Sequence, residues 1–289
     1  MDADTVNALV ESYINIQPDE PLYVQYIDYM SSILVGDFGQ SYIISDQAVS
    51  TILAQALPWT LFLMSIALFL RWTMGIMLGA VMAYMEGSRF DVSMTTTVIT
   101  LHAVPYYVVA IILLWILAFN YPIFPSSGRM DMSTTPGFNI PFMVGVLKHS
   151  ILPILSMLIA GFGGPAVGMR GNSIRVLGED YLRVARLRGL STRRIALRYV
   201  ARNAILPMYT GLLISIGGLF GGSVILERIF GYPGIGYYLF QGTVSRDYPV
   251  MMGGFLLITF AVIVGILVAD LTYGKLDPRA GDPATRETY

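Results

Sequence analysis

The chain contains no cysteine, and charged residues are scarce in it. Without cysteine, neither disulfides nor thiolate metal sites can form. Lys, Arg, Asp and Glu together make up 13% of the 289 residues, whereas soluble domains carry about 25%. The net charge of −1 argues against nucleic-acid binding by the chain as a whole. With 55% hydrophobic residues and a mean hydropathy of +0.62, the composition indicates an integral membrane protein.

Several catalytic patterns are also missing from the sequence. It has no G-x-x-x-x-G-K-[ST] phosphate loop, no H-E-x-x-H metal motif and no G-x-S-x-G nucleophile turn. Its two histidines are His102 and His149. We therefore expect no catalytic site, no metal site and no cofactor bound by this chain, and the class of integral-membrane enzymes is disfavoured.

Five apolar stretches are long enough to cross a bilayer, which takes about 20 residues in a helix. The predicted spans are 59–84, 94–119, 150–169, 204–226 and 250–271. The fold class is therefore an all-α integral membrane protein with five predicted transmembrane helices. Arg71 interrupts the first span, where it could snorkel, pair with Asp270 or mark an error in the span boundary. The cost of a cation in lipid favours a position that faces protein. His102 and Pro105 lie early in the second span, where the histidine is interpreted as a hydrogen-bonded interfacial residue.

The positive charges are distributed very unevenly between the two sides of the predicted spans. Thirteen Lys and Arg residues lie on one side, nine of them within 170–203, and four lie on the other. Because cytoplasmic loops carry the excess of Lys and Arg, this basic loop and the C-terminus are predicted to be cytoplasmic. Residues 1–56 have eight acidic residues and no Lys or Arg, which suits an extracytoplasmic segment. We expect a transmembrane domain at 57–274, with a cytoplasmic loop at about 171–203, and a cytoplasmic tail at 275–289.

The basic loop has the pattern of two helices joined by a glycine turn. Tyr181–Arg188 is helix-prone, Gly189 can end that helix in the left-handed conformation, and Ser191 or Thr192 can cap a second helix from Arg193. Ala185 and Gly189 lie four residues apart, which would allow close approach by a partner. The arginines could serve only as a topology signal. The glycine-centred turn instead favours a structured docking surface.

Five segments resemble a known family. EDYLRVARLRGLSTRRIALRYVARNAILP (179–207) resembles the cytoplasmic coupling loop of membrane permease subunits of binding-protein-dependent ABC importers, of the dipeptide/oligopeptide/nickel type. Arg183-Val184-Ala185 stands where many permeases have Glu-Ala-Ala, and Gly189 matches the glycine of the loop. Arg183 and Arg202 replace a glutamate and a proline of the wider pattern, which narrows the resemblance to the peptide branch. The other four segments follow the order of the family's motifs: DEPLYVQYIDYMSSILVGDFGQSY (19–42), FPSSGRM (124–130), ERIFGYPGIGYYLFQGTVSRDYPV (227–250) and DLTYGKLDPR (270–279).

The resemblance implies a permease subunit in the cell inner membrane that forms half of a solute path. A second homologous permease, two P-loop ATPase subunits that hold ATP and Mg, and an extracytoplasmic solute-binding protein would be its partners. Family members usually have six spans, and this sequence begins after the first of them would end. The solute is expected to be a peptide, with nickel, glutathione or an oligosaccharide as alternatives.

The resemblance also assigns candidate site residues. The expected contacts with the ATPase subunit are Arg183, Ala185, Arg186, Gly189, Leu190, Ser191, Arg193 and Arg194. Two small-x-x-x-small pairs in the fourth span suit either tight helix packing or the translocation path: Gly217, Gly218, Gly221 and Gly222. Aromatic residues of the last outer loop form either a membrane-surface belt or, by the resemblance, a contact with the binding protein: Phe230, Tyr232 and Tyr237.

The alternative function is a stand-alone secondary transporter driven by an ion gradient. Such a transporter usually shows internal repeats and ionisable residues at mid-membrane. The sequence shows no clear repeat, and Arg71 is its one candidate of that kind. A purely structural membrane anchor is disfavoured by the ordered motifs.

Overall fold

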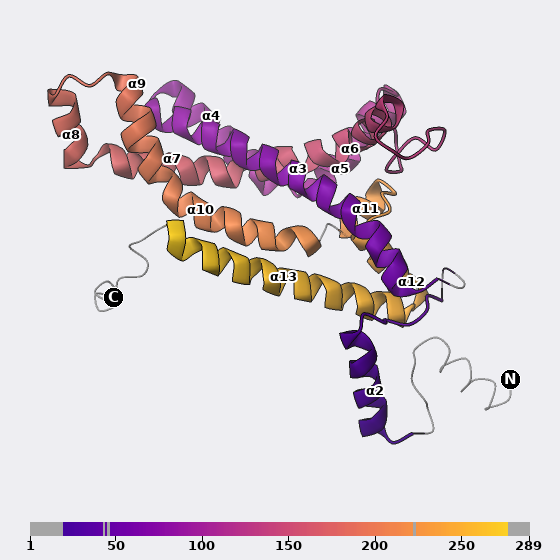
Figure 1. Cartoon of the computed structure of the whole chain (residues 1–289). Coiled ribbons are helices and arrows are strands. Elements are labelled where there is room, and N and C mark those ends of the chain that lie inside the picture. The colour runs from indigo at the N-terminus through magenta and orange to yellow at the C-terminus, as the bar shows by residue number, and fades with distance from the viewer. Residues whose placement is uncertain (1–19, 43, 45–46, 222–223, 277–289) are drawn as a thin grey trace.

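The computed structural model describes residues 20–42, 44, 47–221 and 224–276, and nearly all of them lie in helices or the turns between them (Figure 1). Within these ranges, the one β-type pairing is an isolated bridge between Gln40 and Ala48. The elements are α2 (Leu22–Leu34), α3 (Val49–Tyr84), α4 (Arg89–Ala103), α5 (Tyr106–Leu114), η1 (Trp115–Asn120), α6 (Ile140–Gly161), α7 (Gly163–Leu177), α8 (Asp180–Leu187), α9 (Thr192–Ile195), η2 (Ala196–Val200), α10 (Ala201–Gly217), η3 (Gly218–Gly221), α11 (Val224–Ile229), α12 (Ile235–Ser245) and α13 (Tyr248–Leu276). The all-α fold class is thereby confirmed.

Three helical segments are long and apolar enough to cross a membrane: Val49–Tyr84, Ile140–Leu177 and Tyr248–Val268. A fourth candidate consists of Arg89–Ala103 and Tyr106–Asn120, which meet at a bend of 87°. Pro105 explains the break, because its ring removes a backbone donor and disfavours a helical conformation in the residue before it.

The number and bounds of the predicted spans differ from these helices. The first predicted span begins at residue 59, but α3 already starts at Val49, so the predicted domain boundary at 56/57 falls inside a helix. The predicted span 150–169 is the middle of the longer α6–α7 segment. The predicted span 204–226 divides among α10, η3 and α11, and α10 has 17 residues. Glycines concentrate where it divides, and glycine weakens a helix.

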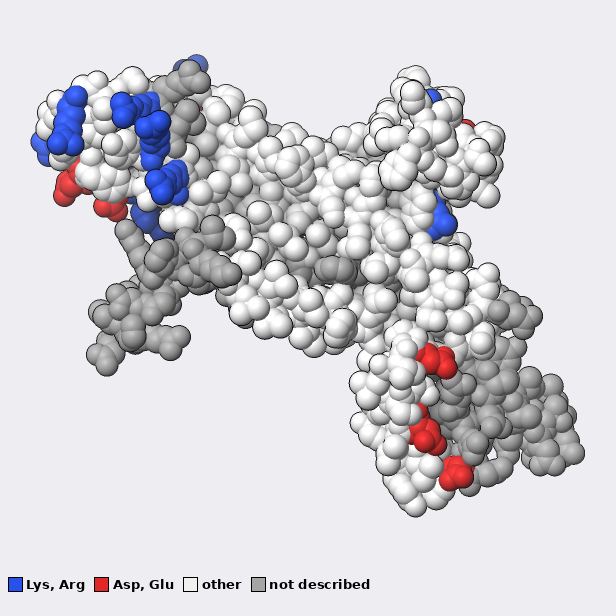
Figure 2. Space-filling model, in the orientation of Figure 1, with Lys and Arg blue, Asp and Glu red and all other residues white. Residues whose placement is uncertain are grey.

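Charge is concentrated at the ends of the long helices. Figure 1 shows α8 and α9 at one end, here called the basic end, and α2 and α12 at the opposite end. Figure 2 shows Lys and Arg gathered over the basic end and a nearly uncharged surface between the two ends. A belt without charge flanked by charged ends is the pattern of a protein embedded in a bilayer.

Helices α3 and α7 pack closely because glycines face the contact. A Cβ atom on Gly75 would lie 2.7 Å from both the carbonyl oxygen of Phe162 and Cβ of Pro165. A Cβ atom on Gly79 would overlap the carbonyl oxygen of Ala166. Small residues allow this approach, which apolar helices in lipid need for van der Waals packing.

At the opposite end, the segment before α3 is held to the start of α13. The fully buried carboxylate of Asp247 accepts hydrogen bonds from Ser41 Oγ at 2.7 Å and from the Tyr42 amide at 2.9 Å. It also accepts from the Val250 amide at 3.2 Å, at the first turn of α13. One side chain thus joins two segments about 200 residues apart.

Candidate functional site

At the basic end, α8, α9 and η2 form a helical hairpin, here called the coupling hairpin (residues 180–200). Gly189 has φ +72° and donates its amide to the Arg186 carbonyl at 2.9 Å. The Leu190 amide donates to the Ala185 carbonyl at 3.3 Å, which completes a Schellman motif. The predicted left-handed glycine turn is confirmed. Helix α9 begins at Thr192, one residue before the predicted start at Arg193.

The inner side of the coupling hairpin is a small apolar core. Leu182 and Ala185 are buried against Ile195 and Val200. Ala185 is only 4% exposed, because the hairpin itself covers its methyl group. It therefore offers little surface for the predicted contact with an ATPase subunit, which stays a prediction. Gly189 is exposed with no atom within 4 Å of an added Cβ. The two small residues therefore do not form a shared open face.

The outer side of the hairpin carries most of the other predicted contact residues. Leu190 is half-buried, Arg193 has a side chain outside the described atoms, and the remaining ones are exposed: Arg183, Arg186, Ser191 and Arg194. Arg188 and Arg198 of the same hairpin are also exposed, and Figure 2 shows Lys and Arg side chains gathered over this end of the molecule. The structure brings these cations to one end of the molecule, as the sequence predicted.

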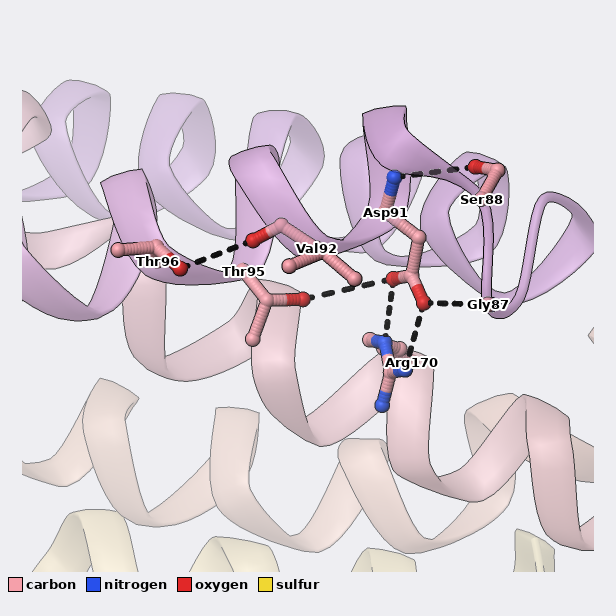
Figure 3. A network of polar contacts seen from close by, with 7 residues as sticks. All are labelled: Gly87, Ser88, Asp91, Val92, Thr95, Thr96 and Arg170. Atoms are coloured by element: carbon pink, nitrogen blue, oxygen red, sulfur yellow. Dashed lines mark hydrogen bonds and ion pairs between the residues drawn. The ribbon is translucent and has the colours of Figure 1, made fainter.

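A bidentate ion pair joins the spans just before the coupling hairpin (Figure 3). Arg170 of α7 donates through Nε and Nη2 to the two carboxylate oxygens of Asp91, at 2.6 and 2.7 Å. Asp91 is 1% exposed and also accepts from the Gly87 amide and from Thr95 Oγ1. The Ser88 hydroxyl caps α4 by accepting from the Asp91 amide. Sequence reasoning counted Arg170 only as a topology charge, because its partner lies 79 residues away.

A cavity of about 700 Å³ separates the coupling hairpin from the membrane helices. Its walls come from α3, α7 and the hairpin, and include Glu86, Ser173, Arg186 and Leu190. The buried Ser173 hydroxyl has no hydrogen-bond partner there. The hairpin is thus attached to the spans through its two chain connections and one edge rather than through a filled interface.

At the opposite end, Glu227 is a fully buried carboxylate that has no cationic partner among the residues that the structure describes. Thr60 Oγ1 donates to its Oε1 at 2.9 Å, and the Tyr237 amide donates to Oε2 at 3.0 Å. Thr60 Oγ1 also accepts from the Ile235 amide at 2.9 Å. Burial raises the pKa of Glu227 to about 7, although these donors act in the opposite direction. The network fixes the start of α12 on α3. Glu227 belongs to α11, which lies outside the four candidate spans.

Two of the residues predicted to contact a binding protein are buried within this chain. Phe230 is 2% exposed and Tyr232 is 0% exposed, and both belong to the largest apolar core, with Leu63 and Leu152. They are core residues because the turn after α11 folds back onto α3 and α6. Tyr237 is partly exposed, and its hydroxyl accepts from Gln241 Nε2.

The segment FPSSGRM packs on the same turn. The Gly128 amide donates to the Phe230 carbonyl at 3.0 Å, and Arg129 Nη1 donates to the Pro233 carbonyl at 2.7 Å. The Arg129 guanidinium also lies 4.7 Å from the centre of the Trp59 ring, a cation–π contact. Two segments that sequence analysis treated separately therefore form one structural unit.

The glycines predicted for the translocation path lie where α10 ends. Gly217 is the last residue of α10, and Gly218–Gly221 form the 3-10 turn η3. Gly218 is exposed, and no atom of the described residues lies within 4 Å of an added Cβ, so it mediates no close helix packing among them. Gly222 lies outside the described residues.

Helix α4 has a polar face that sequence analysis missed. The exposed residues Ser93, Thr96, Thr97 and Thr100 line a shallow groove. Their spacing of i, i+3, i+4 and i+7 is the signal that would have identified a single helix face. The hydroxyls of Thr96 and Thr97 donate to carbonyls one turn earlier, so this face is compatible with lipid or water.

Comparisons with known proteins agree with this arrangement. Residues 75–282 match the family described as "Binding-protein-dependent transport system inner membrane component". The chain is 34% identical over 261 residues to the oligopeptide transport system permease protein AppB of Bacillus subtilis, covering 90% of this chain and 81% of the relative. It is 32% identical to the di/tripeptide transport system permease protein DppB of Pseudomonas aeruginosa, with the same coverage.

Solved structures show the same fold. An inward-facing structure of the MetNI methionine ABC transporter matches with a TM-score of 0.62 at 13% identity, over 78% of this chain and 96% of the other. The family match extends over more than half of the chain, and the curated relatives are similar along 90% of it. The chain therefore belongs to the family of inner membrane components of binding-protein-dependent transport systems, the permease subunits of ABC importers.

Proposed function

We propose that this chain forms one half of the translocation path of an ATP-driven peptide importer. A homologous permease subunit forms the other half, and an extracytoplasmic solute-binding protein delivers the peptide. Two P-loop ATPase subunits hold ATP and Mg and dock at the cytoplasmic side. The similarity to permeases named for oligopeptides and di/tripeptides supports peptides as the solute. The C-terminus of this chain is cytoplasmic, and the chain does no covalent chemistry of its own.

The observation that carries the proposal is the coupling hairpin. Its outer side presents Arg183, Arg186, Ser191 and Arg194 to solvent, while its own apolar core holds their relative positions. Such a surface suits a partner with an acidic or hydrogen-bond-accepting groove, because guanidinium groups bind carboxylates through two parallel donors.

Motion of the coupling hairpin is transmitted to the membrane through α7. Helix α7 enters the hairpin, is fixed to α4 by the Asp91–Arg170 pair, and packs on α3 through Gly75 and Gly79. A push on the hairpin by the closing ATPase subunits therefore displaces three membrane helices together. The cavity beneath the hairpin leaves room for that displacement.

The roles at the other end are narrower than the sequence suggested. With Phe230 and Tyr232 buried, Tyr237 is the remaining contact residue for the binding protein. Gly218 and the polar face of α4 are the exposed elements proposed to line the path.

Because the chain has no cysteine, single cysteines test the orientation and the docking surface directly. Ser191→Cys on the coupling hairpin should react with a membrane-impermeant maleimide only from the cytoplasmic side. Ser31→Cys, exposed on α2, is the matched control and should react only from outside. A cross-linker attached at position 191 should capture a copurifying ATPase subunit, and nucleotide should change the yield.

Each outcome of the cross-linking experiment is informative. Labelling of Ser191→Cys from outside would refute the orientation. Cytoplasmic labelling without capture of an ATPase would refute the docking role and favour a stand-alone secondary transporter driven by an ion gradient.

A further inference from the structure

Arg71 is a cation near the middle of the longest membrane helix. It lies 22 residues after the start of α3 and 13 residues before its end, which correspond to roughly 33 and 20 Å along the axis. Its side chain packs against Gly161, where an added Cβ would lie 3.2 Å from Arg71 Cδ and 3.8 Å from Nη1. Arg71 is only partly buried as a residue, but its Nε atom is buried and has no hydrogen-bond partner among the described residues.

The described acids of this chain do not neutralise Arg71. Within the four candidate spans, the described acidic side chain is that of Asp91, which binds Arg170 with both oxygens. The buried carboxylate of Glu227 is engaged by Thr60 and backbone amides. A cation at this depth is expensive in lipid, and ionisable residues there usually face a partner or a solute pathway.

Arg71 lies close to a discontinuity in a neighbouring span. Gly161, which Arg71 contacts, follows Ala160 in the continuous helical segment Ile140–Leu177. The carbonyl oxygen of Ala160 lies 2.8 Å from Nδ1 of His102, in the last turn of α4. The 87° bend between α4 and α5 follows directly after that turn. Interrupted helices at membrane depth occur where backbone lines a cavity or pathway, and transporters place solute sites there.

We infer that Arg71 is a carboxylate-binding residue of the translocation path and that it receives the C-terminal carboxylate of the transported peptide. The inference rests on the proposed function and specifies the solute contact within it. Every unmodified peptide carries this carboxylate whatever its side chains, so one fixed guanidinium can recognise the class without selecting a sequence. The planar fork of arginine matches a carboxylate with two donors.

The test uses the complete reconstituted importer and two probes, trialanine and trialanine amide. ATP-driven uptake is measured for the wild type, Arg71→Gln and Arg71→Lys. Lys148→Gln is the matched control, because Lys148 is an exposed cation near the start of α6. The selectivity of the binding protein is the same for all variants, so it cancels when the uptake of each probe by a variant is divided by the uptake of that probe by the wild type.

Arg71→Gln should raise KM for trialanine by about 10- to 100-fold, the range expected for losing a charged hydrogen-bond pair. The same variant should leave uptake of the amide within about twofold, since the amide has no charge to lose. Arg71→Lys should restore part of the preference for the free acid. Lys148→Gln should behave as the wild type.

Four results separate the possible failures. Equal effects of Arg71→Gln on the acid and the amide would overturn the inference and assign Arg71 to packing or to a partner subunit. The same loss in Asp270→Asn would overturn it in favour of an internal pair, because the side chain of Asp270 lies outside the described atoms. If Arg71→Gln does not assemble, Arg71→Lys provides the test through the ratio of trialanine uptake to trialanine amide uptake. A ratio that differs from the wild type supports the inference, and an unchanged ratio overturns it. Absence of ATP-driven uptake in the wild type would refute the proposed function itself.

Discussion

Gly189 allows the sharpest test of the coupling hairpin, because its structural role can be separated from its lack of a side chain. Its φ of +72° lies in the left-handed region, while no atom is within 4 Å of an added Cβ. Gly189→Ala therefore meets no clash and carries only the conformational cost, about 1–2 kcal/mol. Because 1.4 kcal/mol is about a tenfold change in an equilibrium, the alanine variant should weaken the turn without abolishing it.

Gly189→Pro is a stronger perturbation of the same residue. Proline fixes φ near about −65° and removes the amide, which in the native turn donates to the Arg186 carbonyl. The Schellman turn cannot form in this variant, and we expect a cost of about 3 kcal/mol or more. The hairpin core of Leu182 and Ile195 would then lose its fixed geometry, and the outer arginines would no longer keep their relative positions.

The assay compares uptake with ATP hydrolysis at equal amounts of subunit in the membrane. Gly189→Ala should reduce binding-protein-dependent uptake in part, and Gly189→Pro should abolish it while the subunit still inserts. Gly36→Ala is the matched control, because Gly36 has φ +82° and equally open surroundings but lies beside α2 at the opposite end. Wild-type uptake in Gly189→Pro would refute the docking role of the hairpin.

Three further predictions concern the membrane helices and the buried carboxylates. Gly79→Ala should lower the free energy of unfolding by about 1–3 kcal/mol through overpacking of α3 on α7, whereas Gly171→Ala, in open space, should not, as thermal unfolding in detergent would show. Asp91→Asn leaves Arg170 without its carboxylate partner and should lower the free energy of unfolding by about 3 kcal/mol, with reduced uptake in the same membranes. An unchanged free energy of unfolding would argue against a stabilising role of the Asp91–Arg170 ion pair. The pKa of Glu227 is about 7 in the folded protein and 4.5 ordinarily, so the folded protein binds more protons between these pH values. The free energy of unfolding should therefore fall by about 3 kcal/mol as the pH rises from 4.5 to 7. Glu227→Gln should remove that pH dependence in a pH series of unfolding measurements.

The network around Glu227 explains why two aromatic residues predicted to contact a binding protein are buried. Phe230 and Tyr232 sit in a segment rich in aromatic residues, which in a membrane protein usually indicates an interface with water. Glu227 and Thr60 instead turn the segment inward, and the Tyr232 hydroxyl lies 3.4 Å from the Trp59 carbonyl oxygen. The sequence shows the aromatic residues but not the direction in which the backbone presents them.

Arg71 shows the opposite case, because the sequence alone identified it as an unusual residue. A cation within an apolar run is visible without any structure, and its cost in lipid already implies a protein-facing position. Its contact with Gly161, beside the Ala160 carbonyl that lies against His102, depends on which helices meet, and no local pattern encodes that.

The sequence by itself determined that the protein is embedded in a bilayer, its fold class, the gathering of basic residues in one loop and the glycine turn at Gly189. Each of these depends on composition or on interactions within a few residues, and hydropathy and backbone sterics act at that range. Only the tertiary structure decided that Ala185 is buried, that Asp91 holds Arg170, and that Glu227 binds α12 to Thr60. These contacts join residues far apart in the chain or depend on which face of a helix is covered, so they are set by helix packing rather than by any local pattern.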